Sequence, residues 1–454
     1  MINTTTGPLS EPIARAAQSA LPRRAVLGGL VAAAAGGLAA CGGGTGNPGG
    51  GGGKGGVLNV WGGVPPESGP DDLIKAFNEE HPDIKVTYTR YVNDDQGNLK
   101  LDTSLQGGVP IDVFFSYSPA NVKKRSNLAL DITERVAGDP DLATFTADAD
   151  PIGNYPLDGK LFCVPAALAP HNVYVNASMV EAAGITLPEN WSVDEYVEVA
   201  RKLTVPGKTF GSLNAPTLAR ATIGSNSNYT EAGKSNFADP LFAKELELAL
   251  SLQKEGTTMP QSQILAEKLK TFPHTPFIAG RVAMVIQAGH LVRYISDTKE
   301  YPHDFKTICM PTPAPEKGKP FWNTGQIGDL MSISAKSKNP DNAWLFLQFW
   351  VKNAAKYMIK GGRLPSLVGD AKPADMITQL LGPDRDKLYD SATFQKFLFE
   401  SDLKVAVDTK FSGATQITQI MEKLTDEVLL GDRTVDSWVT EAVKQADAAI
   451  TTAP

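Results

Sequence analysis

Residues that build metal sites and catalytic centres are scarce in this chain. It has 3 cysteines and 5 histidines among 454 residues. No two histidines stand four residues apart and none lies beside a cysteine pair, so we expect no preformed zinc site. The Gly-x-Ser-x-Gly motif of many hydrolases is also absent. The sequence therefore gives no sign of an enzyme, and we expect neither metal nor cofactor.

Long apolar runs are equally scarce, and the longest lies near the start of the chain. The sixteen residues 25–40 are apolar or small, and the run is shorter than the roughly 20 residues that span a membrane. It follows Arg23-Arg24 and ends in Leu-Ala-Ala-Cys41, which resembles the lipobox of an export signal. We predict that residues 1–40 are removed and that lipidated Cys41 anchors the protein to the outer face of the cytoplasmic membrane. The choice between twin-arginine and general export stays open.

Glycine dominates the segment that follows Cys41. Eleven of the residues in 42–56 are glycine, so ordering this segment would cost much backbone entropy and bury almost no apolar area. We predict a flexible tether over residues 41–56. A phosphate-binding loop is excluded because Lys54 is followed by Gly55 where that motif needs Ser or Thr.

The charge of the chain argues against some classes of partner. The full sequence carries a net charge of −7, and removing residues 1–40 takes away a net +2, which leaves about −9. An acidic protein is poorly suited to nucleic acid or anionic lipid as its main partner. The remaining length of roughly 400 residues exceeds what one hydrophobic core usually serves, so we expect two domains.

From Val57 onward, strands and helices alternate. The predicted strands are 57–61, 84–91 and 111–115, and the predicted helices begin at Asp71 or Asp72 and near Gly97. This alternation predicts parallel βαβ units, with ligands at the carboxyl ends of the strands. Later helices begin at a capping box, Ser192 to Glu195, and at Pro340. Trp344, Trp350 and Trp438 have helical spacing typical of a core, whereas Trp61 and Trp322 lie in loops where cleft exposure is as reasonable.

Five segments, in order, resemble motifs of the family 1 extracellular solute-binding proteins. The segments are 158–165 with 173–176 ("dGk-x-x-x-vP … yyN"), 181–185, 189–195, 277–284 ("f-x-x-Gk-x-Am") and 334–343 ("is-x-xSknp-x-xA"). This family comprises sugar-binding components of ABC importers, and maltose-binding protein is a distant member. The resemblance implies an α/β fold of two lobes that close on a ligand like a hinge. It assigns 57–168 and 312–364 to the first lobe, and 169–311 and 365–454 to the second.

The same resemblance indicates where the ligand site lies. Sugars present hydroxyl groups and a weakly apolar ring face, so aromatic and hydrogen-bonding side chains are expected around them. The candidate ligand residues are Trp61, Gly63, Ser116, Tyr117, Ser118, His171, Asn172, Asn214, Gln287, His290, Trp322, Asn323, Gln326 and Arg363. His290 stands where maltose-binding protein stacks a tryptophan, which argues against a long maltodextrin.

These observations favour a monomeric sugar receptor that delivers its ligand to ABC permease subunits. Two alternatives stay open. A carbohydrate-cleaving enzyme would need two carboxylates facing one cleft, and the paired carboxylates in the sequence are interpreted instead as solvated loops. A receptor for a sugar phosphate or glycerol phosphate would use Arg363 and His290 to bind phosphate. A polyamine receptor is disfavoured because the candidate residues are neutral to basic.

Two cysteines remain after Cys41. Cys163 and Cys309 each lie two residues before a proline, Pro165 and Pro311, at crossings between lobes that the resemblance implies. Export leads to an oxidising environment, so we predict a disulfide between them if the strands are in register. The alternative, two separate buried thiols, stays open.

Overall fold

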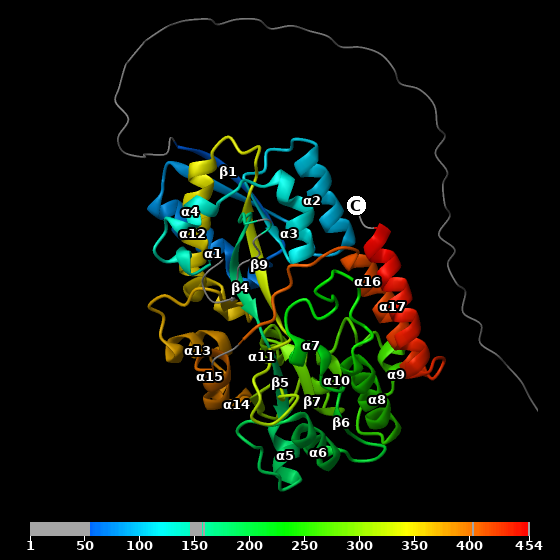
Figure 1. Ribbon diagram of the computed structural model, residues 1–454. Helices are drawn as coiled ribbons and strands as arrows, with labels where there is room; N and C mark the ends of the chain where they lie inside the picture. Colours follow the sequence, from blue (N-terminus) through cyan, green and yellow to red (C-terminus); the bar gives the residue numbers. More distant parts are fainter. Residues whose placement is uncertain (1–54, 146–156, 158, 402–403, 453–454) are drawn as a thin grey trace, which may run out of the picture. The chain divides into compact units, whose positions relative to one another are not determined.

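The computed structural model describes residues 55–145, 157, 159–401 and 404–452 (Figure 1). The predicted signal peptide, Cys41 and the tether up to Lys54 lie outside these residues. The described strands form two sheets, one ordered β10-β4-β9-β3-β1-β2 and the other β6-β7-β5-β8. The predicted mixed α/β class is confirmed.

The first three strands and their helices follow the predicted alternation. They are β1 (Gly56–Gly62), α1 (Pro70–Glu80), β2 (Ile84–Arg90), α2 (Asp95–Gln106) and β3 (Val113–Ser116). β1 pairs in parallel with both β2 and β3. The carboxyl ends of these strands therefore meet at one edge, as expected.

The predicted start of α1 was wrong by a few residues. The residue that precedes the helix is Gly69, in the left-handed conformation with φ 90°, and Pro70 takes the first helical position. Proline suits that position because its fixed φ is already helical and its missing N–H has no intrahelical partner. Asp71 and Asp72 instead lie in the first turn, where negative charge favours the helix dipole.

The chain completes the first sheet with antiparallel strands from later in the sequence. These are β4 (Val164–Ala169), β9 (Gln326–Ile333) and the short β10 (Leu364–Pro365). β9 lies between β3 and β4 and pairs with both. Only Pro170 separates β4 from β5 (His171–Asn176), so the chain passes from one sheet to the other within a single residue.

The second sheet contains β5, β6 (Phe210–Ser212), β7 (Val282–Ala288) and β8 (Thr307–Pro311). β5 pairs antiparallel with both β7 and β8, and β6 pairs in parallel with β7. The helix α6 (Val193–Leu203) packs on this sheet and begins with the predicted capping box between Ser192 and Glu195, which is confirmed.

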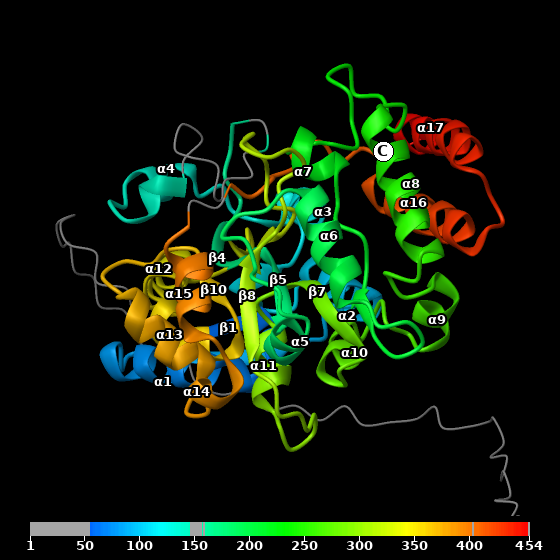
Figure 2. The same ribbon diagram turned by 90° about the horizontal axis from the view of Figure 1, so that it is seen from below.

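Three large apolar clusters hold these elements together. The first sheet packs against α1 and α12 (Pro340–Tyr357), with Trp350 fully buried. The second core joins the second sheet to α13 (Pro373–Leu381) and α15 (Ser391–Phe399). A third cluster surrounds Trp438, where α16 (Ala414–Leu430) and α17 (Val435–Thr452) pack on α8 (Pro240–Lys254) (Figures 1 and 2). Trp350 and Trp438 are core residues as predicted, and Trp344 is partly buried against the first core.

The predicted disulfide is not formed. Cys163 and Cys309 are both free and buried. Cys163 packs in a small cluster beside the first sheet, whereas Cys309 lies on β8 in the core of the second. Burial raises the pKa of the Cys163 thiol to about 12 and also raises that of Cys309. The equal distance of each cysteine from a proline does not place them on paired strands, because Cys163 belongs to one sheet and Cys309 to the other.

The remaining helices are short. They are α3 (Pro119–Arg125), α4 (Thr133–Ala137), α5 (Ala177–Ala182), α7 (Ala219–Ile223), α9 (Gln261–Ala266), α10 (His274–Ile278), α11 (Leu291–Ser296), α14 (Arg385–Leu388) and four 3-10 turns, η1 (Pro66–Ser68), η2 (Ser126–Leu128), η3 (Leu142–Phe145) and η4 (Ile359–Gly361). Within the described ranges, no helix combines the length and apolarity needed to cross a membrane. The same residues contain no group of three or more His, Cys, Asp or Glu side chains placed to hold a metal.

Candidate ligand-binding site

Two tyrosines line the loop that follows β1. The hydroxyl of Tyr117 accepts a hydrogen bond from the main-chain N–H of Gly63, and the hydroxyl of Tyr88 accepts one from Val64 at 3.0 Å. Gly63 leaves room for the Tyr117 ring, since a β-carbon there would lie 3.0 Å from the hydroxyl oxygen. Burial raises the pKa of both phenols, so they stay protonated at neutral pH.

Arg363 follows η4 and lies next to these tyrosines. Its Nε donates to Oδ2 of Asp329 at 2.9 Å, and its Nη1 donates to the Ser68 hydroxyl at 2.8 Å. Burial acts to lower the Arg363 pKa, but the Asp329 carboxylate outweighs it and the pKa is raised; Tyr117 and Tyr88 lie close enough to contribute. Asp329 is only 4% exposed, so this is a largely buried ion pair.

Two histidines lie at the second sheet, and one of them, His290, is close to Arg363. His290 follows β7, and a β-carbon on Gly362 would lie 3.0 Å from the α-carbon of His290. His171 begins β5, and its Nδ1 lies 3.1 Å from the hydroxyl of Thr324. Partial burial lowers the pKa of each ring to about 4, and the charge of His171 also acts on His290. Both imidazoles are therefore neutral at pH 7 and can each donate and accept a hydrogen bond.

A cavity of about 190 Å³ opens beside His171. Its lining includes Asn214, Thr217, Ala221, Ile286, Thr312 and Thr324. The charge of Arg220 also acts on His171, and Arg220 itself makes two hydrogen bonds to Asp408, at 2.9 and 3.1 Å. Trp322 is linked to the wall of this cavity, because its main-chain N–H donates to the carbonyl oxygen of Ala221. Its indole occupies the space that a side chain on Gly224 would need.

The structure thus brings together half of the predicted ligand residues. Along the series given in the next sentence, each residue is linked to its neighbour by a contact, by an electrostatic effect or by a shared cavity wall. The linked residues are Gly63, Tyr117, Arg363, His290, His171, Asn214 and Trp322. We call this set, with Tyr88, Asp329, Arg220 and Asp408, the candidate site. Their ligand roles stay proposals.

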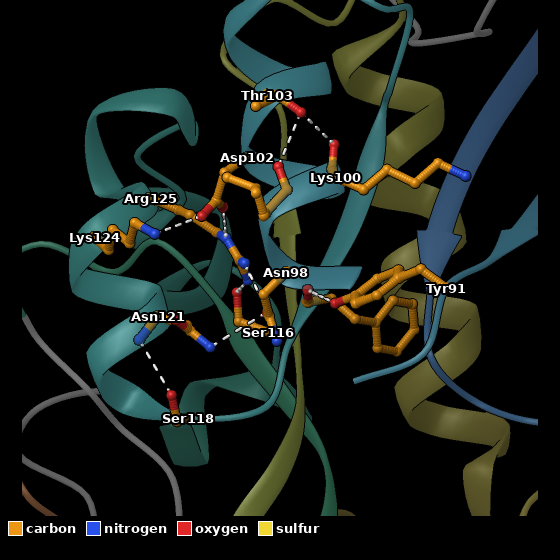
Figure 3. Close-up of polar contacts among 12 residues, drawn as sticks. Tyr91, Asn98, Lys100, Asp102, Thr103, Ser116, Ser118, Asn121, Lys124 and Arg125 are labelled. Atoms are coloured by element: carbon orange, nitrogen blue, oxygen red, sulfur yellow. Dashed lines mark hydrogen bonds and ion pairs between the residues drawn. The ribbon is translucent and has the colours of Figure 1, made fainter. Parts of the chain in front are cut away.

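Two predicted serines, Ser116 and Ser118, bond to residues of α3, as Figure 3 shows. Ser116 is fully buried, and its hydroxyl accepts a hydrogen bond from Nη1 of Arg125 at 2.9 Å. Arg125 is 1% exposed and also binds Asp102 at 2.6 Å. Ser118 caps α3 by accepting from the N–H of Asn121. Both serines therefore have structural partners inside the first lobe, and their role as ligand residues stays a prediction.

Asn323 also has structural partners, and its role as a ligand residue stays a prediction. Its side-chain amide bonds to both the N–H and the carbonyl of His171, and its oxygen accepts a second bond from Gly325. Its own main chain pairs with Lys404 and Ala406. Asn323 therefore ties together the chain segments at His171, at Gly325 and at residues 404–406, and its amide keeps one N–H that bonds to no described group.

The last four predicted residues are not joined to the candidate site by any described contact. Trp61 packs near α2, with the Lys100 ammonium 5.6 Å from its ring. Asn172 is fully buried beside Gln287, and neither atom of its amide has a hydrogen-bond partner among the described residues. Gln326 is exposed at the start of β9.

Four members of the candidate site were missed from the sequence. Asp329 offered a signal, because an acidic residue interrupts an otherwise apolar strand. Tyr88 also offered a signal, because it lies near the carboxyl end of β2, as Tyr117 lies at that of β3. Arg220 and Asp408 offered none, since they are 188 residues apart and no local motif marks either one.

Comparison with known proteins is consistent with this architecture. The family of bacterial extracellular solute-binding proteins matches residues 63–357 of the chain. An uncharacterized lipoprotein from the oleD 5′ region of Streptomyces antibioticus is 25% identical over 305 residues, which are 62% of this chain and 63% of that protein. This chain therefore spans less than two thirds of that relative.

Solved structures with the same fold include sugar-binding proteins. A sugar transporter of Rhizobium etli in an open conformation gives a TM-score of 0.67 at 20% identity and covers 88% of this chain and 100% of its own. A cyclic α-maltosyl-1,6-maltose binding protein of Arthrobacter globiformis gives 0.68 at 16% identity, covering 87% and 99%. At these identities the likeness shows the fold, which is the two-lobed fold of periplasmic binding proteins. The motif resemblance is confirmed, and the chain belongs to the family of bacterial extracellular solute-binding proteins.

Proposed function

We propose that this protein captures a sugar in the candidate site and delivers it, chemically unchanged, to the permease of an ABC importer. The observation that carries the proposal is the kind of groups gathered there. The neutral imidazole of His171 and the amide of Asn214 line a cavity. The neutral imidazole of His290 and the indole of Trp322 do not line it, but the charge of His171 acts on His290, and Trp322 bonds to Ala221 of the cavity wall. Hydroxyl arrays and a weakly apolar ring face need such a mixture. The printed names of the R. etli and A. globiformis proteins support the same ligand class.

The cavity beside His171 accounts for part of a ligand only. Its volume of about 190 Å³ is below the roughly 300 Å³ at which typical ligand pockets begin. A sugar seated there would extend toward His290 and Arg363 and would be enclosed when the two lobes close. The site would then use groups from both sheets.

The state of the nearby carboxylates favours binding over cleavage. A glycosidase needs one carboxyl group that can give up a proton and a second that acts as base or nucleophile. In the candidate site, the carboxylates of Asp329 and Asp408 are each bound to an arginine. Each carboxylate is therefore already engaged by an arginine, which leaves neither free to act on a glycosidic bond.

A thermal-shift screen with neutral mono- and oligosaccharides tests the function. A ligand at 100 times its dissociation constant adds about 2.7 kcal/mol to the free energy of unfolding, which is readily measured. We expect at least one sugar to stabilise the protein and to be recovered intact after long incubation. Recovery of cleaved product would support the enzyme instead, and a panel with no stabilising sugar would contradict the proposal.

We further propose that the protein is exported, anchored through lipidated Cys41 and monomeric. The support is the Leu-Ala-Ala-Cys41 segment with the glycine tract after it. The S. antibioticus relative is named as a lipoprotein, and the family name describes extracellular proteins. A lipid anchor would keep the receptor beside its permease while the tether lets it reorient.

A further inference from the structure

Backbone strain is concentrated at the candidate site. Among the described residues, three that are not glycine have a positive φ: Asn226 at 58°, Lys268 at 57° and Asp329 at 48°. The left-handed conformation costs such residues about 1 kcal/mol or more and persists where surrounding contacts enforce it. Two of the three, Asp329 and Asn226, hold the two arginine–carboxylate pairs of the site. Strained residues of this kind commonly mark ligand clamps.

Asp329 disturbs the regular alternation of β9. Ile327 and Leu330 are three residues apart, yet both pack in the small cluster beside Cys163, whereas Met331 packs in the first core. A regular strand would place Ile327 and Met331 on one face and Leu330 on the other. The left-handed turn at Asp329 accounts for this shift, and it directs the carboxylate to Nε of Arg363.

The second ion pair, between Arg220 and Asp408, is also held by a residue in the left-handed conformation, Asn226. The N–H of Asn226 donates to Oδ1 of Asp408 at 2.6 Å, and the Asn226 amide oxygen accepts from the N–H groups of Thr409 and Lys410. Asp408 is thereby fixed against Arg220, which it binds through both oxygens. Each arginine of the site therefore has a carboxylate held against it by a residue in the left-handed conformation.

We propose that Asp329, together with Asp408, makes the site selective for uncharged sugars by neutralising its two arginines. This inference rests on the proposed function and names the class of ligand more closely. The two ion pairs carry no net charge, and the two histidines add none. Arg293, whose charge also reaches His290, lies over the Tyr294 ring and donates to its hydroxyl.

The energetics of phosphate binding explain the selectivity. A phosphate ester entering near Arg363 would lie close to the Asp329 carboxylate, and a desolvated anion without a free cationic partner is strongly disfavoured. A sugar hydroxyl meets no such cost. It can accept a hydrogen bond from Nη2 of Arg363, which donates to no described protein group, because Asp329 and Ser68 are bound by Nε and Nη1.

The test removes one charge and keeps the backbone conformation. Asp329→Asn retains an acceptor for Arg363, and asparagine tolerates the left-handed conformation well. Binding of inorganic phosphate and glycerol 3-phosphate is measured by calorimetry on the mature protein. We expect no measurable binding at millimolar concentration to the parent and at least a tenfold gain in affinity for the variant. Asp341→Asn is the control, since it removes a carboxylate that is 79% exposed and paired with Arg135 away from the site.

Asp408→Asn provides a second, independent variant if Asp329→Asn does not fold. It should also gain phosphate affinity, because it leaves Arg220 without its carboxylate. A folded Asp329→Asn or Asp408→Asn protein that gains no affinity overturns the inference, as does a parent that binds glycerol 3-phosphate more tightly than any neutral sugar. A parent that binds no sugar while Asp329→Asn gains phosphate binding would contradict the proposed function but not the neutralisation by Asp329.

Discussion

Gly289 and Gly362 meet back to back, with no space for a side chain on either residue. A β-carbon on Gly362 would lie 2.6 Å from the carbonyl oxygen of Gly289, and one on Gly289 would lie 2.9 Å from that of Gly362. Gly289 follows a strand of the second sheet, and Gly362 precedes a strand of the first. This contact brings His290 and Arg363, the residues that follow, next to each other.

Replacing Gly362 by alanine should therefore disturb both stability and binding. The residue has φ 77°, which alanine adopts at a cost of about 1 kcal/mol, and the clash with Gly289 adds to it. We expect a loss of roughly 2 to 4 kcal/mol in urea denaturation. Gly431→Ala is the matched control, since Gly431 has φ 86° and nothing within 4 Å of an added β-carbon. Equal losses in the two variants would show that the contact between the glycines is unimportant.

Removal of either large ring of the candidate site should weaken sugar binding. Truncating a well-packed anchor commonly costs 2 kcal/mol or more, which corresponds to about thirtyfold in affinity. We expect this loss for both Trp322→Ala and His290→Ala, measured by calorimetry with a sugar from the screen. Circular dichroism should show an unchanged fold. A variant that binds within twofold of the parent would remove that residue from the site.

The buried ion pair between Asp102 and Arg125 should matter to stability alone. Removing Arg125 leaves the buried Asp102 carboxylate with only Lys124, whose side chain is 62% exposed, as its charged partner. Arg125→Ala should therefore lower the free energy of unfolding by about 3 kcal/mol. Arg135→Ala, which breaks the exposed pair with Asp341, should cost less than about 1 kcal/mol. Chemical denaturation of both variants checks the difference, and similar values would refute it.

Acid should destabilise the protein through His171. The folded pKa is lowered to about 4, mainly by burial, while the unfolded value is about 6.5. Between these values the unfolded chain binds more protons, so stability falls as the pH drops from 6.5 toward 4. His171→Gln should flatten this part of the melting-temperature profile. An unchanged slope in the variant would assign the effect to other groups.

Cys41→Ala should abolish membrane anchoring. The lipid needs the cysteine thiol, so we expect the variant to lose label from a radioactive fatty acid and to leave the membrane fraction or remain unprocessed. A Cys163→Ala variant is the control, because that thiol is buried in the fold. Normal lipid labelling of Cys41→Ala would contradict the predicted anchor.

The sequence predicted best what depends on nearby residues. The capping box between Ser192 and Glu195 spans four residues and needs no knowledge of the fold. Ser116 and Tyr117 show the limit, because adjacent residues at a strand end face opposite ways and composition does not say which one faces a cleft. Long-range pairing could not be predicted. Arg220 and Asp408 are 188 residues apart, with two crossings between the sheets in the intervening chain. Cys163 and Cys309 are separated because they lie at different sheets.

Asn323 couples the motions of three chain segments. Because one side chain and its own backbone hold His171, Gly325, Lys404 and Ala406, these segments cannot bend one at a time. If one sheet rotated against the other, these segments would bend together, with Asn323 at the hinge. A ligand at His171 would then lie close to the rotation axis and move little. The parts of the two lobes farthest from Asn323 would move the most. A small sugar could in this way produce a displacement large enough for a permease to detect.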